Sequence, residues 1–152
     1  MQPSNPLQTG FLDSYGHPAV RITVHGVTEA AQQDFEAMID TGFTGFLMMP
    51  LTSAFPLTLT LMGTANYELA DGTLCSKLLA FGSVILEGEA VNGVITLEEN
   101  NDCGLLLGMD FLRKARRALW VHQSGVLLVH NDVVDQVNTA LMALRETAVC
   151  RD

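Results

Sequence analysis

Basic residues are scarce in this sequence of 152 residues. Eight Lys and Arg stand against 17 Asp and Glu, so the formal net charge at pH 7 is −9. A protein that binds nucleic acid without sequence preference needs a surplus of positive charge, and the composition argues against that class. One local cluster is basic although the net charge of the chain is negative, and we interpret this cluster as a solvated helix face rather than a site of anion contact. It consists of Arg113, Lys114, Arg116 and Arg117.

Cysteine is also rare, and its three positions are widely spaced. Cys75, Cys103 and Cys150 form no C-x-x-C pair, and no His lies at ligand spacing from them. The pattern excludes a disulfide framework and the usual zinc sites, and it indicates reduced thiols in a cytoplasmic protein. We therefore expect neither a metal nor a cofactor.

Long apolar runs are missing as well. No stretch approaches 18 apolar residues, and residues 1–16 lack the basic and apolar regions of a signal peptide. We expect no membrane association and a flexible lead-in over residues 1–16. With 48% apolar residues, a chain of this length can bury about 70% of its unfolded surface in one domain.

The apolar residues that are present favour short strands. Val20, Ile22 and Val24 alternate with polar residues, as a half-buried strand requires. Similar patterns predict strands at residues 35–39, 57–61, 65–69, 74–81, 83–87, 91–97, 104–108, 119–121 and 126–129. Helices are predicted over 109–118 and from Asp132 onward. The expected fold class is mostly β: a small closed, mainly antiparallel barrel with one short internal helix and an added C-terminal helix.

The most informative motif is Asp40-Thr41-Gly42, which follows the apolar strand at 35–39. A carboxylate at the end of a buried strand is costly unless hydrogen-bond donors compensate. Thr41 and Thr44 offer hydroxyl groups, and Gly42 permits a close approach of the backbone. We therefore expect the Asp40 carboxylate to be held by donors from its own loop.

A second apolar segment, Leu106-Leu107-Gly108, follows about 65 residues later and leads into the helix predicted at 109–118. With the Asp-Thr-Gly motif and the hairpin at residues 67–77, it resembles the retropepsin-like aspartic proteases over residues 18–129. The sequence departs from the family pattern at two points. Phe43 stands where the family usually has a small residue, and the tip of the hairpin contains less glycine than in the viral members.

The resemblance implies roles for individual residues. Asp40 would be catalytic, supported by Thr41, Gly42 and Thr44, and the protease domain would cover residues 17–130. A flap would be formed by Leu69, Ala70, Asp71, Gly72 and Thr73. Phe43, Phe46 and Leu74 are candidates for the substrate pocket, and Leu106, Leu107 and Gly108 form the structural motif.

The sequence contains only one Asp-Thr-Gly, whereas peptide hydrolysis of this kind needs two carboxylates that share one proton. Asp102-Cys103-Gly104 is interpreted as a loop. The hypothesis is therefore a homodimeric aspartic endopeptidase that acts on peptides or proteins at acidic to mildly acidic pH. The alternative is a non-catalytic module of the same fold that binds peptides or dimerises. Residues 131–152 are predicted as a helical extension that adds a dimer contact.

Overall fold

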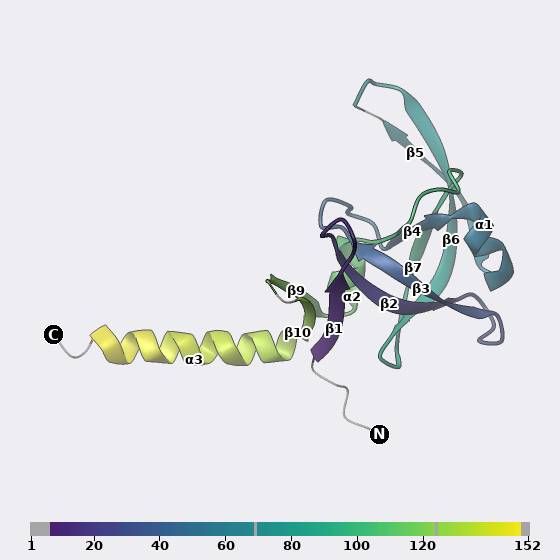
Figure 1. The fold of residues 1–152 in the computed structure, drawn as a ribbon. Helices are drawn as coiled ribbons and strands as arrows, with labels where there is room; N and C mark the ends of the chain where they lie inside the picture. Colours follow the sequence, from purple (N-terminus) through teal and green to yellow (C-terminus); the bar gives the residue numbers. More distant parts are fainter. Residues whose placement is uncertain (1–6, 69, 124, 150–152) are drawn as a thin grey trace.

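The computed structural model describes residues 7–68, 70–123 and 125–149, and in them ten strands form one sheet (Figure 1). The strands are β1 (Leu7–Leu12), β2 (Pro18–His25), β3 (Gln32–Ile39), β4 (Leu47–Pro50), β5 (Thr60–Glu68), β6 (Leu74–Leu86), β7 (Glu89–Glu98), β8 (Leu105–Leu107), β9 (Arg117–His122) and β10 (Gly125–His130). The helices are α1 (Leu51–Ala54), the 3-10 helix η1 (Phe55–Leu57), α2 (Met109–Lys114) and α3 (Asn131–Val149).

Six of the strands close into a barrel, which confirms the predicted fold class. They follow the order β6-β7-β4-β8-β3-β2, and a ladder between β2 and β6 closes the ring. Most ladders are antiparallel, but β3 pairs with β8 and β4 pairs with β7 in parallel. The interior is filled by fully buried apolar side chains, among them Val20, Val24, Leu47, Ile95 and Leu107.

The structure differs from the sequence prediction in several elements. The helix predicted over 109–118 ends as α2 at Lys114, and β9 begins at Arg117. The segment expected as a flexible lead-in contains β1, which pairs with β10 and β2. Leu57 and Leu59, expected in a strand, lie in and after η1, which has Pro56 in its first turn and ends at Thr58 with φ of 51°. Finally, β6 continues through Gly82, where a break was predicted. The glycine provides space for β2 rather than a turn, because a Cβ there would lie 3.0 Å from the His25 carbonyl oxygen.

The short strand β8 lies between β3 and β4 and joins two distant parts of the chain. It pairs with β3 from Ala37 to Ile39 and with β4 at Leu47 and Met48. At its end, the Gly108 N–H donates to the Phe46 carbonyl oxygen over 3.1 Å. A Cβ on Gly108 would lie 2.2 Å from the Gly45 carbonyl oxygen. The loop that follows β3 is thus packed directly against the backbone that follows β8.

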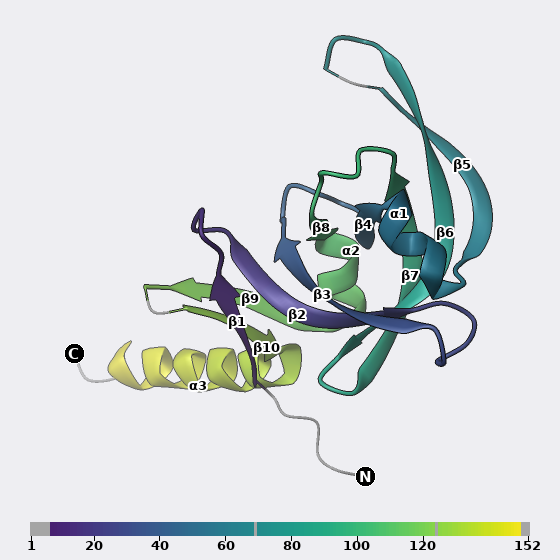
Figure 2. The same cartoon turned by 45° about the vertical axis from the view of Figure 1, so that its right-hand side comes forward.

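The β5–β6 hairpin extends away from the barrel (Figure 2). The ladder between β6 and β7 begins at Leu78, opposite Leu97, so the β6 residues before Leu78 pair only with β5. At this point of departure Lys77 Nζ donates to both carboxylate oxygens of Glu98, over 2.5 and 2.6 Å. The hydrogen bond from Lys77 holds the pKa of Glu98 below its usual range, and Glu98 raises the pKa of Lys77. The pair fixes the hairpin to the barrel.

The basic cluster at residues 113–117 is only partly the solvated helix face that the sequence predicted, because Arg113 and Lys114 are exposed on α2 whereas Arg117 is buried. Arg117 lies on β9 with only 4% of its surface exposed and pairs with Glu89 over 3.2 Å. Lys114 pairs with Asp110 over 2.9 Å, and Arg116 pairs with Asp132 over 2.7 Å. Arg117 therefore makes an internal contact, whereas the pairs of Lys114 and Arg116 lie on the surface.

We predict that Glu98→Gln lowers the free energy of unfolding by about 1–3 kcal/mol at pH 7, because it removes the charged partner of a largely buried ammonium group. Since the pKa of Glu98 is lowered in the folded state, the pair contributes stability above the ordinary carboxyl pKa of about 4.3, and this stability is lost as pH falls through the lowered value. Urea unfolding between pH 3 and 7 measures both effects. The exposed neighbour provides the control variant, Glu99→Gln. Equal losses in both variants would contradict a stabilising pair.

We also predict that Gly108→Ala costs about 1–3 kcal/mol of unfolding free energy, because the new methyl group meets fixed backbone oxygens rather than a movable side chain. A Cβ on Gly104, just before the other end of β8, would have no heavy atom within 4 Å, so Gly104→Ala is the matched control. Chemical denaturation compares the two variants. A Gly108→Ala protein as stable as Gly104→Ala would show that the loop is not held by this contact.

Candidate active site

Asp40 occupies the first position after β3, and backbone hydrogen bonds fix it there. Its N–H donates to the Leu107 carbonyl oxygen over 2.9 Å, and its own carbonyl oxygen accepts from the Phe43 N–H over 3.2 Å. The residue is half-buried. The predicted candidates Asp40 and Leu107 are thus brought together by the β3–β8 ladder, which ends at the pair Ile39 and Leu107.

The Asp40 carboxylate is oriented by the loop that follows it. The Gly42 N–H donates to Oδ1 over 2.9 Å, and a Cβ on Gly42 would lie 3.1 Å from that same oxygen. Within the described residues of one protomer, the exposed Thr41 and Thr44 donate no hydroxyl hydrogen bond to Asp40. The expected main-chain donor is therefore present, whereas the two threonines are exposed and available to other partners.

The two aromatic pocket candidates have different surroundings. Phe43 is half-buried, and its ring lies over Gly45, where a Cβ would come within 2.4 Å of the ring. Phe46 is only 2% exposed and packs edge-on against Phe111 with ring centroids 5.6 Å apart. Phe46 thus belongs to the hydrophobic core, contrary to the pocket position predicted from the sequence.

Gly45 is a site residue that the sequence analysis missed. Its carbonyl oxygen accepts from the Asp110 N–H over 3.2 Å, next to the bond from the Met109 N–H to the Phe43 carbonyl oxygen at 2.8 Å. These bonds connect the Asp40 loop to the start of α2. A second glycine three residues after Gly42, with Phe43 between them, is the sequence signal that could have identified Gly45.

The predicted flap residues lie at the tip of the β5–β6 hairpin. Asp71 Oδ1 accepts the Thr73 N–H over 2.9 Å, and Gly72 has φ of 82°. The bond from Thr73 lowers the pKa of Asp71, so the turn carries a negative charge. Leu74 is 70% exposed at the start of β6, and Leu69 lies outside the described residues. The tip is thus a closed turn with an exposed apolar residue beside it.

An apolar cavity of about 240 Å³ lies at the base of this hairpin. It contains none of the predicted pocket residues, and the α1–η1 segment that forms one wall was not predicted as a helix from the sequence. Its walls have the chemistry to accept an apolar side chain. The lining residues are Leu51, Ala54, Phe55, Thr58, Leu59, Leu61, Leu78 and Leu97.

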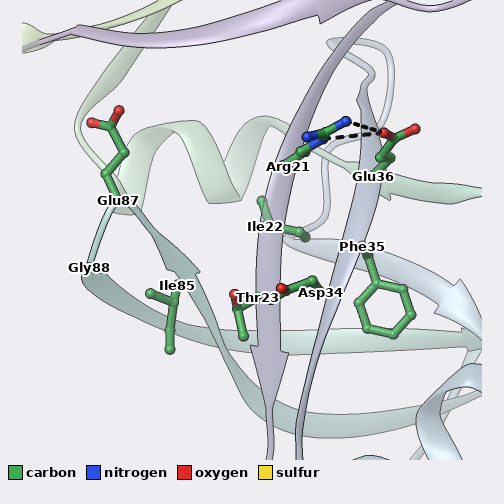
Figure 3. A pocket seen from close by; sticks show the side chains of 9 residues that line it. All are labelled: Arg21, Ile22, Thr23, Asp34, Phe35, Glu36, Ile85, Glu87 and Gly88. Carbon is green, nitrogen blue, oxygen red and sulfur yellow. Dashed lines mark hydrogen bonds and ion pairs between the residues drawn. The ribbon is translucent and has the colours of Figure 1, made fainter.

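A larger surface pocket, of about 560 Å³, lies on the outer side of β2 and β3 (Figure 3). It is lined by Arg21, Ile22, Thr23, Asp34, Phe35, Glu36, Ile85, Glu87 and Gly88. Four of its polar side chains bond in pairs, since Arg21 pairs with Glu36 over 3.3 Å and Thr23 donates to Asp34 over 2.5 Å. None of the predicted site residues lines it, so it is separate from the Asp40 site.

The described residues include no cluster of three or more His, Cys, Asp and Glu side chains that could hold a metal ion. They also include no helix that is long and apolar enough to cross a membrane.

Comparisons with known proteins agree with this geometry at the level of the fold. No protein-family model and no curated protein sequence matches the chain. Among solved structures, it is similar to a retropepsin-like aspartic protease from Rickettsia conorii, with a TM-score of 0.60 and 18% identity over 82% of this chain and 90% of that chain. It is also similar to the EIAV protease complexed with the inhibitor HBY-793, with a TM-score of 0.55 and 11% identity over 72% of this chain and 97% of that chain. The chain therefore has the fold of the retropepsin-like aspartic proteases.

Proposed function

We propose that the protein is an aspartic endopeptidase whose active site contains two Asp40 carboxylates, one from each protomer of a homodimer. The observation that carries the proposal is the fixed position of Asp40 within this fold. The β3–β8 ladder holds its backbone, and the Gly42 N–H orients its carboxylate. A scaffold with no chemistry to perform does not need an acidic side chain held in this way.

The second carboxylate comes from a second copy, because the sequence has one Asp-Thr-Gly motif. A two-fold axis that passes between two Asp40 loops would place the same groups on both sides of a substrate. The exposed Thr41 of each loop is then available for a hydrogen bond across the interface. This arrangement agrees with a chain that has room for one domain.

The two carboxylates would share one proton, because two adjacent negative charges repel each other strongly. The ionised carboxylate takes a proton from water as the water oxygen attacks the peptide carbonyl carbon. The protonated carboxylate donates its proton to the carbonyl oxygen. Collapse of the tetrahedral intermediate breaks the C–N bond, and the leaving nitrogen takes up a proton, which yields a carboxylic acid and an amine. Both macroscopic pKa values belong to the pair, so we expect activity to fall on either side of an acidic to mildly acidic optimum.

The β5–β6 hairpin is the candidate flap. It extends from the barrel beyond Leu78, and its tip is the turn at Asp71 and Gly72. An extended peptide beneath such a hairpin would be held mainly by main-chain hydrogen bonds, while apolar subsites select its side chains. Phe43 and Leu74 are the two sequence-predicted pocket residues with accessible surface, and we propose that they line these subsites. Closure of the hairpin would exclude bulk water.

We predict that the wild-type protein cleaves members of a peptide library between about pH 4 and 7 and that Asp40→Asn lowers kcat/KM at least about 100-fold, since it removes the general base and acid. The matched control is Glu36→Gln, a carboxylate four residues earlier on β3 with its side chain exposed, and it should retain activity. Mass spectrometry of the digests identifies the cut bonds. Inert wild-type protein across this pH range, or an Asp40→Asn variant with normal activity, would refute the proposal and favour the non-catalytic module.

A further inference from the structure

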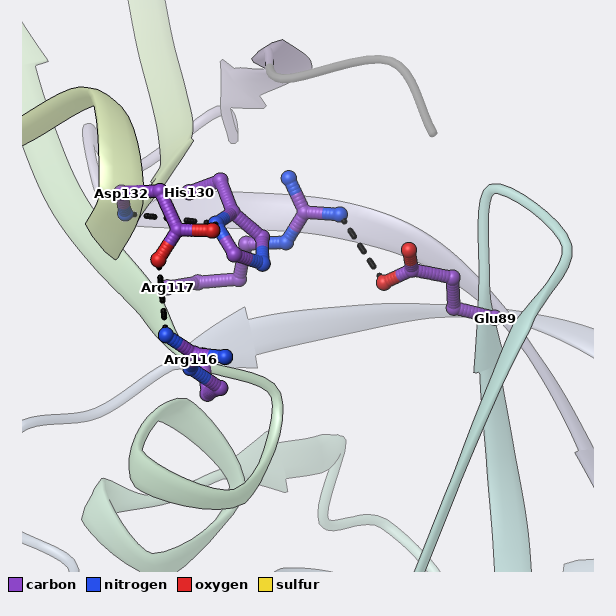
Figure 4. Close-up of polar contacts among 5 residues, drawn as sticks. All are labelled: Glu89, Arg116, Arg117, His130 and Asp132. Carbon is purple, nitrogen blue, oxygen red and sulfur yellow. Dashed lines mark hydrogen bonds and ion pairs between the residues drawn. The ribbon is translucent and has the colours of Figure 1, made fainter. Parts of the chain in front are cut away.

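Hydrogen bonds hold the first residues of α3, Asn131 and Asp132, to the neighbouring elements. Arg116 Nη2 donates to Asp132 Oδ1 over 2.7 Å, and the Asp132 N–H donates to His130 Nδ1 over 3.3 Å (Figure 4). The Asn131 N–H donates to the Arg116 carbonyl oxygen over 2.9 Å. These bonds attach the start of the helix to the turn between α2 and β9. The direction in which α3 leaves the barrel is therefore fixed by its first residues.

After Val134, α3 has little contact with its own protomer. Val133 and Val134 are half-buried, whereas every residue from Asp135 to Arg145 is exposed. Both ribbon views show the helix extending past the β9–β10 hairpin and away from the barrel (Figures 1 and 2). Most of the stability of a helix in a protein comes from the packing of its amphipathic face, so α3 would gain stability from a partner that covers its exposed part.

The exposed part of α3 carries an apolar stripe with coiled-coil spacing. Val134, Val137, Leu141 and Leu144 follow one another at intervals of three, four and three residues, as the core positions of a heptad do. The last three are 52%, 52% and 66% exposed. Asp135 and Thr139 lie on the opposite face of the helix, as their positions in the helical turn require.

The stripe continues onto β9. Val137 and Trp120 line the same groove of about 310 Å³ between α3 and β9, and Trp120 is 62% exposed. We call Trp120, Val137, Leu141 and Leu144 the α3 surface. Exposed aromatic and aliphatic side chains that adjoin in this way are typical of the buried centre of a protein interface.

A second copy of the chain is the occupant that fits this surface best. The α3 surface contains no charged residue, so it offers no electrostatic attraction to a strongly charged partner, whereas a Val and Leu stripe with heptad spacing is complementary to itself. Two copies with a net charge of −9 each repel one another, and an apolar contact can overcome that repulsion. The proposed active site is also incomplete in one chain.

We propose that the α3 surface packs against the same surface of a second copy and so helps to bring the two Asp40 loops together. The part of this inference that concerns the Asp40 loops rests on the proposed function. The packing itself does not, because it follows from the exposed stripe and its position on the fold. In this arrangement the partner copy contacts the α3 surface, which lies outside the barrel.

Sedimentation equilibrium of the full chain tests the contact, with Asp40→Asn as the background so that cleavage plays no part. We expect this protein to dimerise and Leu141→Glu to weaken the dimer by about 30-fold or more, as for a central interface residue. The control is Thr139→Glu, which adds the same charge to the opposite face of the same helix and should leave the dimer unchanged. Circular dichroism checks that both variants remain folded, and Leu144→Ser replaces Leu141→Glu if that variant does not fold.

The outcomes separate this inference from the proposed function. A dimer that Leu141→Glu weakens, together with wild-type protein that cleaves no peptide, would support the α3 contact and refute the protease. Peptide cleavage by a dimer that neither Leu141→Glu nor Leu144→Ser affects would refute the contact and leave the protease. A background protein that stays monomeric at all concentrations, or whose α3 surface binds lipid vesicles or another protein instead, would overturn the inference.

Discussion

The close approach of two backbone segments, one after β3 and one after β8, is the constraint on which the candidate site depends. Gly108 permits it, because any side chain there would meet the carbonyl oxygens of Phe43 and Gly45. The bonds from the Gly108 and Met109 N–H groups to the Phe46 and Phe43 carbonyl oxygens then hold the loop in one shape. The position of Asp40 is thus set by backbone contacts, which leaves its carboxylate available for chemistry.

The same constraint connects the site to the core. Phe46 lies at the end of the loop, packs on Phe111 of α2, and rests on Gly93 of β7, where a Cβ would be only 2.3 Å from the ring. Lys114 Nζ lies 5.4 Å from the centroid of the same ring. The loop that carries Asp40 is therefore anchored at one end by the β3–β8 ladder and at the other by an aromatic contact. A catalytic group gains from such an anchor, because small displacements reduce activity strongly.

The barrel and the motif residues could be predicted from the sequence because their signals are local. Alternating apolar residues mark β2, and a single Asp-Thr-Gly after an apolar strand marks the site. The predictions that were wrong have a common cause. They concern residues whose structure or burial depends on partners that are distant in the sequence. The segment 7–12 is a strand because β10 and β2 pair with it. Phe46 is core because Gly93 leaves space for it, and Arg117 is buried because Glu89, 28 positions earlier, accepts its hydrogen bond.

The Lys77–Glu98 pair also has a mechanical consequence. It lies where β6 leaves the barrel, so the hairpin beyond it would act as an arm with its pivot near the pair if the hairpin moved. From Lys77 to the turn at Gly72 the arm is about 16 Å long, at about 3.3 Å per residue. A rotation of about 10° at the pivot would displace the tip by about 3 Å, close to the rise of one strand residue. A small change in geometry at one ion pair is thus amplified at the end of the hairpin, where a bound peptide would meet it.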